Sequence, residues 1–261
     1  MSKEQVSEYI KVELAGVKFE IECFYQRTYS FFRDYLASFD KPDYTLSVTK
    51  SEIDRNRRIV SYISDDDTLS IVTDSDSHNE ISILFKKITN ALMEHSTLLM
   101  HGTVVGMGDN AFMITAPSGT GKSTRARIWL EEYPESIILN GDKPFITVTD
   151  TSVIACGTPW CGKEGWNTNA MIPLRAILLL ERADEDENNM IERISAQEAF
   201  PFLMRQTYCE HDSVDIKRVV QLLKKIECKV KLYRFHSVPT PEAIHLAYET
   251  VISDIDVDGV S

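Results

Sequence analysis

The sequence holds 261 residues, of which 43% are hydrophobic and 26% charged, and its formal net charge at pH 7 is −12. This length allows one large domain or a small domain joined to a larger one, and the composition predicts a packed core rather than pervasive disorder. The balance of 40 acidic against 28 basic side chains argues against a broad nucleic-acid surface, which needs a basic patch. We therefore expect no nucleic-acid partner.

The cysteines and the N-terminus indicate a cytoplasmic protein. The five cysteines form no Cys-x-x-Cys pair and show no framework spacing, which argues against a disulfide scaffold and a structural zinc site. The first residues are charged and lack the apolar core of a signal sequence. No stretch approaches the roughly 18 apolar residues that a membrane-spanning helix needs. We expect a cytoplasmic location and no membrane partner.

The first part of the chain predicts a small α+β lobe over residues 1–97. Alternating apolar residues predict strands and a hairpin, and apolar residues at helical spacing predict helices. The predicted elements are a hairpin over 9–23, a helix over 25–39, strands over 44–48 and 59–63, a second hairpin through 65–72, and a connecting helix over 79–97.

From residue 98 to 261 the pattern changes to strands mixed with helices, which predicts an α/β core within an α+β chain. The predicted strands cover 100–105, 111–115, 137–139, 145–148, 177–180 and 229–235. The predicted helices cover 123–133, 196–205, 214–225 and 241–252.

Residues 116–124 read Ala-Pro-Ser-Gly-Thr-Gly-Lys-Ser-Thr and predict a phosphate-binding P-loop between a strand and a helix. The Walker A pattern begins with glycine, and here alanine stands first. The glycines allow several N–H groups to turn inward, and the following helix adds its positive N-terminal end. A random glycine-rich turn is the alternative, but the apolar strand before it and the helix after it favour phosphate binding. The predicted nucleotide-binding residues are Ser118, Gly119, Thr120, Gly121, Lys122, Ser123 and Thr124.

Within this loop the chemistry indicates ATP and Mg²⁺ as cofactors. Lys122 would contact the outer phosphates, the Ser123 hydroxyl would coordinate Mg²⁺, and Thr124 could donate to an inner phosphate. The motif is specific for phosphate binding and says little about the reaction that follows.

His101-Gly102, a short turn, an apolar strand and then Ser-Gly-x-Gly-Lys-Ser together resemble the catalytic domain of the HPr kinase/phosphorylase family. The resemblance covers residues 98–205 and is strongest over 100–145. It implies the P-loop nucleotide-binding core that this family shares with phosphoenolpyruvate carboxykinases. The first hundred residues do not resemble that family's N-terminal domain, and segments 139–144 and 157–165 indicate a separate HPr-kinase-like branch.

The resemblance implies that Asp142 is the catalytic base or a metal partner, because HPr kinases hold two adjacent aspartates at this place. Here the matching pair is Gly141-Asp142, so one carboxylate is missing. Lys122 and His101 complete the expected catalytic set. The family's counterpart of His101 is proposed to tune the acid, and without a second acid His101 could carry more of the base role. The alternatives are a turn aspartate in Asn-Gly-Asp and a histidine buried in the core.

Two further segments carry candidate substrate and metal contacts. The glycine-rich loop over 157–165 could close over the substrate, with Lys163 on a phosphate and Glu164 on the metal. Arg205, at the end of a predicted helix, could reach the phosphates. An ordinary surface loop and a solvated arginine are the alternatives.

These observations favour an ATP- and Mg²⁺-dependent kinase whose partner is a hydroxyl acceptor, either serine in a protein or peptide or a small molecule. Members of the resembled family also use pyrophosphate and assemble as oligomers, so a pyrophosphate donor and a homo-oligomer are open. A nucleotide-binding regulatory protein without transfer activity is the second hypothesis, and Gly141 favours it. A phosphoenolpyruvate carboxykinase is the third, but the chain looks too short and shows no clear set of oxaloacetate-binding arginines.

Overall fold

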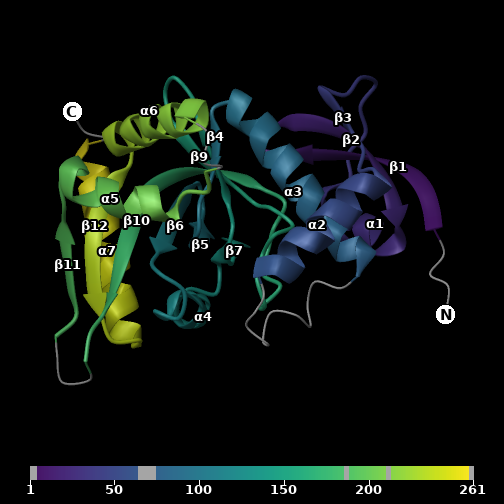
Figure 1. The fold of residues 1–261 in the computed structure, drawn as a ribbon. Coiled ribbons are helices and arrows are strands. Elements are labelled where there is room, and N and C mark those ends of the chain that lie inside the picture. Colours follow the sequence, from purple (N-terminus) through teal and green to yellow (C-terminus); the bar gives the residue numbers. More distant parts are fainter. Residues whose placement is uncertain (1–4, 64–74, 185–187, 210–212, 259–261) are drawn as a thin grey trace. The chain divides into compact units, whose positions relative to one another are not determined.

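A computed structural model describes residues 5–63, 75–184, 188–209 and 213–258 (Figure 1). The chain forms two compact units, Met1–His95 and Ser96–Ser261. The boundary lies two residues before the position between 97 and 98 that the sequence pattern predicts. Ser96 adopts a left-handed backbone with φ of 57°, two residues after the end of the helix that closes the first unit. None of the helices within the described residues is long and apolar enough to span a membrane.

The first unit is a three-stranded sheet in the order β1-β2-β3 with helices against it. The predicted first hairpin is confirmed, because β1 and β2 pair antiparallel and the two-residue turn between them has φ of 52° at Ala15 and 79° at Gly16, as a tight hairpin turn requires. β3 runs parallel to β2. The elements are β1 (Gln5–Leu14), β2 (Val17–Tyr25), α1 (Gln26–Phe32), η1 (Arg33–Tyr35), β3 (Tyr44–Leu46), α2 (Lys50–Ile63) and α3 (Asp76–Glu94).

Two predictions in this unit need correction. The strand expected over 59–63 is wrong, because these residues end helix α2. The reason is the start of the helix: the Thr49 hydroxyl accepts from the Glu52 N–H at 3.3 Å, and the Glu52 carboxylate accepts from the Thr49 N–H at 2.7 Å. This reciprocal cap starts a helix that runs through the β-branched residues. The helix expected over 25–39 stops at Phe32 and continues as one 3₁₀ turn. The hairpin expected through 65–72 lies outside the described residues.

The second unit is built on a nine-stranded sheet in the order β4-β8-β9-β10-β6-β5-β7, with β12 on β10 and β11 on β12. The prediction of a mixed α/β fold is confirmed. The strands are β4 (Thr97–Leu99), β5 (Thr103–Met107), β6 (Asn110–Thr115), β7 (Ile137–Asn140), β8 (Phe145–Val148), β9 (Val153–Cys156), β10 (Met171–Arg182), β11 (Met190–Arg193) and β12 (Lys231–Ser237). Of these, the sequence pattern missed β4, β9 and β11, and it had extended the connecting helix to residue 97.

The long strand β10 joins two regions of the sheet. Its first residues pair antiparallel with β9, whereas from Leu174 onward it runs parallel to β6 on one side and, from Ala176, to β12 on the other. The register shifts between Leu174 and Ala176, where the strand passes from one pairing to the other. Because β6 is a central strand beside β10, the segment that follows its carboxyl end is held on a rigid scaffold.

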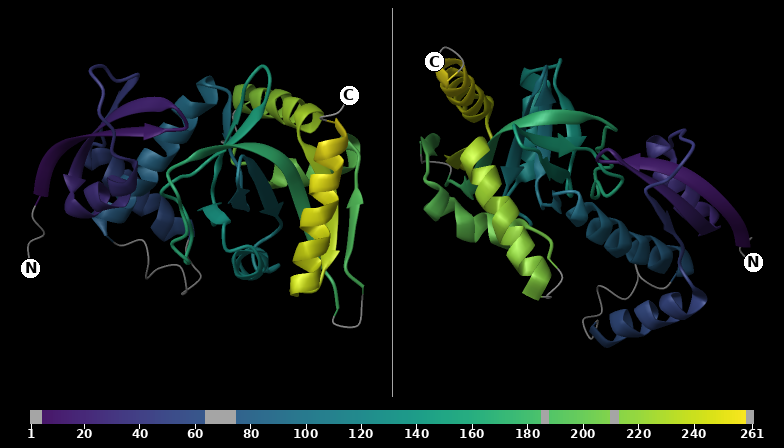
Figure 2. Two further views of the ribbon diagram at one scale, coloured as in Figure 1. Left: turned by 180° about the vertical axis from the view of Figure 1, so that it is seen from behind. Right: turned by 90° about the horizontal axis from the view of Figure 1, so that it is seen from above.

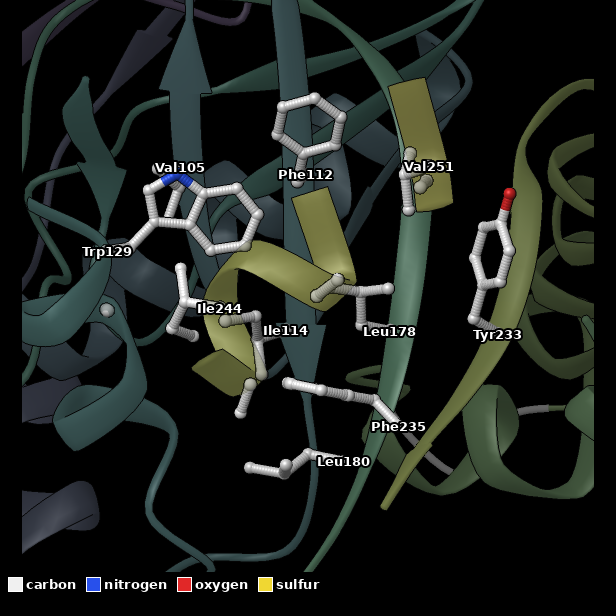
Figure 3. Close-up of a cluster of buried hydrophobic side chains, with 14 of the residues drawn as sticks. Val105, Phe112, Ile114, Trp129, Leu178, Leu180, Tyr233, Phe235, Ile244 and Val251 are labelled. Carbon is white, nitrogen blue, oxygen red and sulfur yellow. The ribbon is translucent and has the colours of Figure 1, made fainter. Parts of the chain in front are cut away.

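Helices α4 (Lys122–Glu132) and α7 (Pro241–Asp258) pack on this sheet around one apolar core (Figures 2 and 3). The Trp129 side chain of α4 is fully buried and stacks on Phe112 of β6, with 5.6 Å between ring centroids. Burying each large apolar side chain contributes roughly 1.5–3 kcal/mol to folding. The core thus fixes α4 directly behind β6. The remaining helices are α5 (Ala196–Gln206) and α6 (Ser213–Lys229).

The strand expected over 100–105 begins only at Thr103, so its first three residues were assigned wrongly. β4 ends at Leu99 and β5 begins at Thr103, so His101 and Gly102 lie in a break and not on a strand. Their N–H groups donate to the carbonyls of Gln206 at 2.6 Å and Asp142 at 2.9 Å. These partners are a helix end and a turn, and this is why no strand ladder continues through His101.

Candidate functional site

The glycine-rich loop, residues 116–121, connects the end of β6 to the start of α4. Gly119 and Gly121 have φ of 82° and 101°, backbone angles that favour glycine over residues with a side chain. Gly121 is the residue immediately before α4, so the first N–H groups of this helix have no partner within it. A strand, a loop with two left-handed glycines and a helix N-terminus form the arrangement that binds anions in many proteins.

Lys122 is held inside this loop. Its Nζ donates to the carbonyls of Ala116 at 2.9 Å and Pro117 at 3.2 Å, and it meets His101 Nε2 at 2.8 Å. An ammonium group has three N–H donors, and these contacts use all of them. Burial lowers the pKa of Lys122, and the nearby Asp142 carboxylate opposes that shift. Lys122 is therefore a buried cation that ties the loop to His101.

His101 links Lys122 to Asp142. Its Nδ1 lies 3.0 Å from Asp142 Oδ1, on the side of the ring opposite the contact with Lys122. Because the ammonium of Lys122 can only donate, Nε2 accepts, and the proton of a neutral imidazole resides on Nδ1 and is donated to Asp142. The Thr115 hydroxyl donates to the His101 carbonyl at 2.7 Å and fixes the backbone at this point.

Asp142 is an ionised carboxylate with two partners. Oδ1 accepts from His101, and Oδ2 accepts from Lys143 Nζ at 2.8 Å. The hydrogen bond from His101, and then the hydrogen bond and the charge of Lys143, hold the pKa of Asp142 well below its usual range, although burial acts in the opposite direction. Lys122, His101 and Asp142, all predicted from the sequence as catalytic, are thus brought together in one hydrogen-bonded chain.

Asn140, which sequence analysis did not single out, shapes the turn that carries Asp142. Its side chain is fully buried, and its Oδ1 accepts from the N–H groups of Asp142 at 2.8 Å and Lys143 at 2.6 Å. Its Nδ2 donates to the Thr158 carbonyl at 2.9 Å. The Asn-Gly-Asp pattern signals a turn of this kind. The contact with Thr158 has no local signal.

Gly141 occupies a place where a side chain does not fit. Its N–H donates to the Trp166 carbonyl at 2.9 Å, and a Cβ atom there would come within 2.9 Å of the Cys161 carbonyl oxygen. On the other side of the turn, a Cβ at Gly162 would lie 3.0 Å from the Asp142 Cβ. The loop over 157–166 thus packs against the turn and takes the space that an acid at position 141 would need.

The other candidate ligands are not brought to this cluster by any contact in the described residues. Glu164 is exposed and pairs with Arg127 of α4 at 3.4 Å, and the Arg127 guanidinium lies 5.7 Å from the centre of the Trp166 ring. Lys163 is exposed in the same loop. Among residues 5–63, 75–184, 188–209 and 213–258, no three His, Cys, Asp or Glu side chains group together as a metal site.

Helix α5 contacts the His101 segment through its backbone, and the side chain of Arg205 makes no contact with that segment among those found in the described residues. The Arg205 side chain is exposed, and its guanidinium lies 6.0 Å from the Phe202 ring centre. The neighbouring Gln206 carbonyl accepts from the His101 N–H at 2.6 Å, and Thr207 forms a β-bridge with Met100. The end of α5 therefore supports the backbone of the His101 segment.

No protein-family model matches this chain, and no curated protein matches it. Among solved structures, the Hpr(Ser) kinase/phosphatase from Coxiella burnetii is similar over 62% of this chain and 99% of that chain, with a TM-score of 0.36 and 9% sequence identity. At this TM-score and identity the likeness carries no argument about what this chain does.

Proposed function

We propose that the second unit is an ATP- and Mg²⁺-dependent kinase of the HPr-kinase-like kind, transferring phosphate to a hydroxyl group. The observation that carries this proposal is the hydrogen-bonded chain from Lys122 through His101 to Asp142. It starts in the glycine-rich loop and ends on an ionised carboxylate. Phosphoryl transfer depends mainly on positioning and electrostatic stabilisation, and this chain joins a phosphate-binding element to a group that can orient an acceptor.

On the donor side, the loop amides and Lys122 would hold the phosphates of ATP. The three contacts that Lys122 makes within the protein occupy the donors it would use on phosphate. Binding of the donor would therefore exchange at least one of them for a phosphate oxygen. A phosphate contact is charge-assisted and stronger than a bond to a neutral carbonyl, which favours this exchange.

On the acceptor side, Asp142 would accept a hydrogen bond from the incoming hydroxyl, with His101 keeping the carboxylate in place. The depressed pKa of Asp142 keeps it ionised at neutral pH, as an acceptor of that proton must be. The acceptor would be a serine in a protein or peptide, or a hydroxyl of a small metabolite.

A magnesium ion fits the residues present. Mg²⁺ is commonly bound through one or two carboxylates together with substrate phosphates and water, so it needs no cluster of three protein ligands. Ser123, at the start of α4, and Asp142 would hold it, and Glu164 is paired with Arg127 instead. When bound, the ion would neutralise charge on the phosphates.

A nucleotide-binding regulatory protein without transfer activity is the second candidate, and Gly141 favours it. The resembled kinases hold a second aspartate at this place, and here the Cys161 carbonyl closes the space to any side chain. The same observation argues against HPr itself as the acceptor, because the site departs from the one that acts on HPr.

The test is transfer of labelled γ-phosphate from ATP to arrays of serine peptides and hydroxyl metabolites, with pyrophosphate as the alternative donor. Transfer that Asp142→Asn abolishes would support the kinase. ATP binding without transfer to any acceptor, and with affinity unchanged in Asp142→Asn, would support the regulatory protein. His101→Ala separates the roles, since an unchanged transfer rate in this variant would remove His101 from the catalytic set.

A further inference from the structure

Arg125, on the first turn of α4 behind the glycine-rich loop, is a buried cation that the proposed chemistry leaves without a role. Its side chain is 1% exposed, a rare degree of burial for arginine. Burial, and secondarily the charge of Arg182, lowers the pKa of Arg125 to about 10, so it stays charged at neutral pH. The charge also sits at the end of a helix where the backbone dipole disfavours cations.

The contacts of Arg125 join the loop to a distant strand. Its Nε donates to Ser237 Oγ at 2.9 Å, and its Nη2 donates to the Ser237 carbonyl at the end of β12. On the other side, Nη1 donates to the carbonyls of Gly121 at 3.3 Å and Thr120 at 3.5 Å. All these partners in the described residues are neutral oxygens. Burying a charge without an acidic partner is costly to folding, so we consider a role of Arg125 other than packing.

The peptide geometry shows what these contacts do to the loop. In a trans peptide the carbonyl of one residue and the N–H of the next point in opposite directions. Holding the carbonyls of Thr120 and Gly121 toward the guanidinium therefore turns the N–H groups of Gly121 and Lys122 away from it. A Cβ atom at Gly121 would lie 2.8 Å from Nη1, so the glycine also allows this close approach.

We propose that Arg125 is a positioning residue that holds the glycine-rich loop in the shape that receives a diphosphate, using Ser237 as its anchor. The proposal rests on the phosphate-binding function proposed above. It requires the planar fork of arginine, because one group must reach Ser237 and two loop carbonyls at once. A lysine at this place would keep the charge and lose the fork.

The experiment compares the affinity for inorganic pyrophosphate and for ATP, by calorimetry, in wild type, Arg125→Met, Arg125→Lys and Ser237→Ala. Thermal unfolding without ligand is measured alongside. Arg175→Met is the matched control, because Arg175 is exposed and bonds Asn110, at the far end of β6 from the loop. We expect Arg125→Met to weaken both ligands by the same factor, about tenfold or more, because the loss lies in the phosphate contacts they share.

The affinity of Arg125→Lys for both ligands is expected to lie within about threefold of that of Arg125→Met, because lysine keeps the charge but loses the hydrogen bonds that shape the loop. The affinity of Ser237→Ala should lie between those of wild type and the two Arg125 variants, because only part of the anchor is lost. Wild-type affinity in Arg125→Lys would overturn the positioning role. So would wild-type affinity in Arg125→Met with only a lower unfolding temperature. If Arg125→Met does not fold, the lysine and Ser237 variants decide on the same terms. A wild type that binds neither ligand would overturn the proposed function as well.

Discussion

Glu80 in the first unit and Asp142 in the second are carboxylates that each accept hydrogen bonds from more than one residue, and they behave differently. Glu80, in the first unit, accepts from the Phe24 N–H at 2.8 Å and from the Thr28 hydroxyl, and it is fully buried. Asp142, in the second unit, accepts from His101 and Lys143 and keeps its side chain 21% exposed. Burial raises the pKa of Glu80, whereas hydrogen bonds from His101 and Lys143 lower that of Asp142.

The difference separates a structural carboxylate from a candidate functional one. Glu80 of α3 accepts from the backbone of Phe24 in β2 and from the Thr28 hydroxyl of α1, so it ties these two elements to α3. Its partners are neutral and belong to the fold. Asp142 is bonded by groups that can change their charge or move, and it stays open to solvent. A carboxylate with such partners beside a glycine-rich loop is a candidate for chemistry.

The largest expected effect is on transfer. Asp142→Asn should lower phosphate transfer by roughly 100- to 10,000-fold, because the neutral amide cannot take the acceptor's proton. Glu80→Gln should leave the transfer rate unchanged. Steady-state kinetics of both variants with the same acceptor give the two transfer rates. Equal losses in the two variants would contradict the claim that Asp142 acts in transfer and Glu80 does not.

The next effect is on stability. Glu80→Ala removes the acceptor for buried donors and should lower the free energy of unfolding by about 2–3 kcal/mol. Asp142→Ala should cost less, because its partners His101 and Lys143 can turn to water. Urea unfolding of both variants gives the two values. A larger loss at Asp142 than at Glu80 would mean that Asp142 holds the fold together more than Glu80 does.

A third variant tests why the site has one carboxylate and not two. Gly141→Ala places a Cβ 2.9 Å from a backbone carbonyl and should cost about 1–3 kcal/mol, with lower transfer because Asp142 follows on the same turn. Gly108→Ala is the control: its φ of 56° costs about 1–2 kcal/mol, but its Cβ meets nothing within 4 Å and transfer should not change. Higher transfer in Gly141→Asp would show that the space can open.

The smallest expected effect is on the pH dependence of stability, to which Glu80 and Asp142 contribute with opposite sign. The folded state binds the Glu80 proton more tightly than the unfolded chain, so this group's contribution to stability falls as pH rises from about 4.3 toward its raised pKa. The contribution of Asp142 is fully present above about pH 3.9 and is lost as pH falls through its depressed pKa. The urea midpoint of unfolding is measured as a function of pH. Its dependence on pH should become weaker above about pH 4.3 in Glu80→Gln, and weaker below about pH 3.9 in Asp142→Asn. Slopes of one sign would contradict the assignment.

Much of the fold could be predicted from local patterns, since alternation and helical spacing are written in neighbouring residues. The hairpin through Gly16 and the strand, loop and helix around Lys122 follow from such patterns. The errors arose where a local pattern has two interpretations. Residues 59–63 are rich in β-branched residues, as strands are, and the cap formed by Thr49 and Glu52, a signal present in the sequence, starts the helix that contains them. His101 was assigned to a strand, and long-range bonds to Gln206 and Asp142 break it.

The residues that form the candidate cluster could be predicted from the sequence, whereas the residues that support it could not. Lys122 was predicted because glycine-rich loops have a recognisable sequence, and Asp142 because the resemblance to HPr kinases implies a carboxylate at that place. Nothing in the sequence around Arg125 distinguishes it from other helix residues, because its partner Ser237 is far away in the chain, at the end of β12. The pairing of Glu164 with Arg127 also joins segments far apart in the chain. Such contacts depend on the packing of the whole unit.

The central claim is that the loop beside Asp142 receives the phosphates of a nucleotide. Calorimetric titration of wild type and Lys122→Met with Mg²⁺-ATP tests it most directly. We predict saturable binding by the wild type and an affinity at least about tenfold weaker in the variant, because a charge-assisted contact to phosphate is lost. Absence of binding in the wild type, or equal affinity in the two proteins, would contradict the claim.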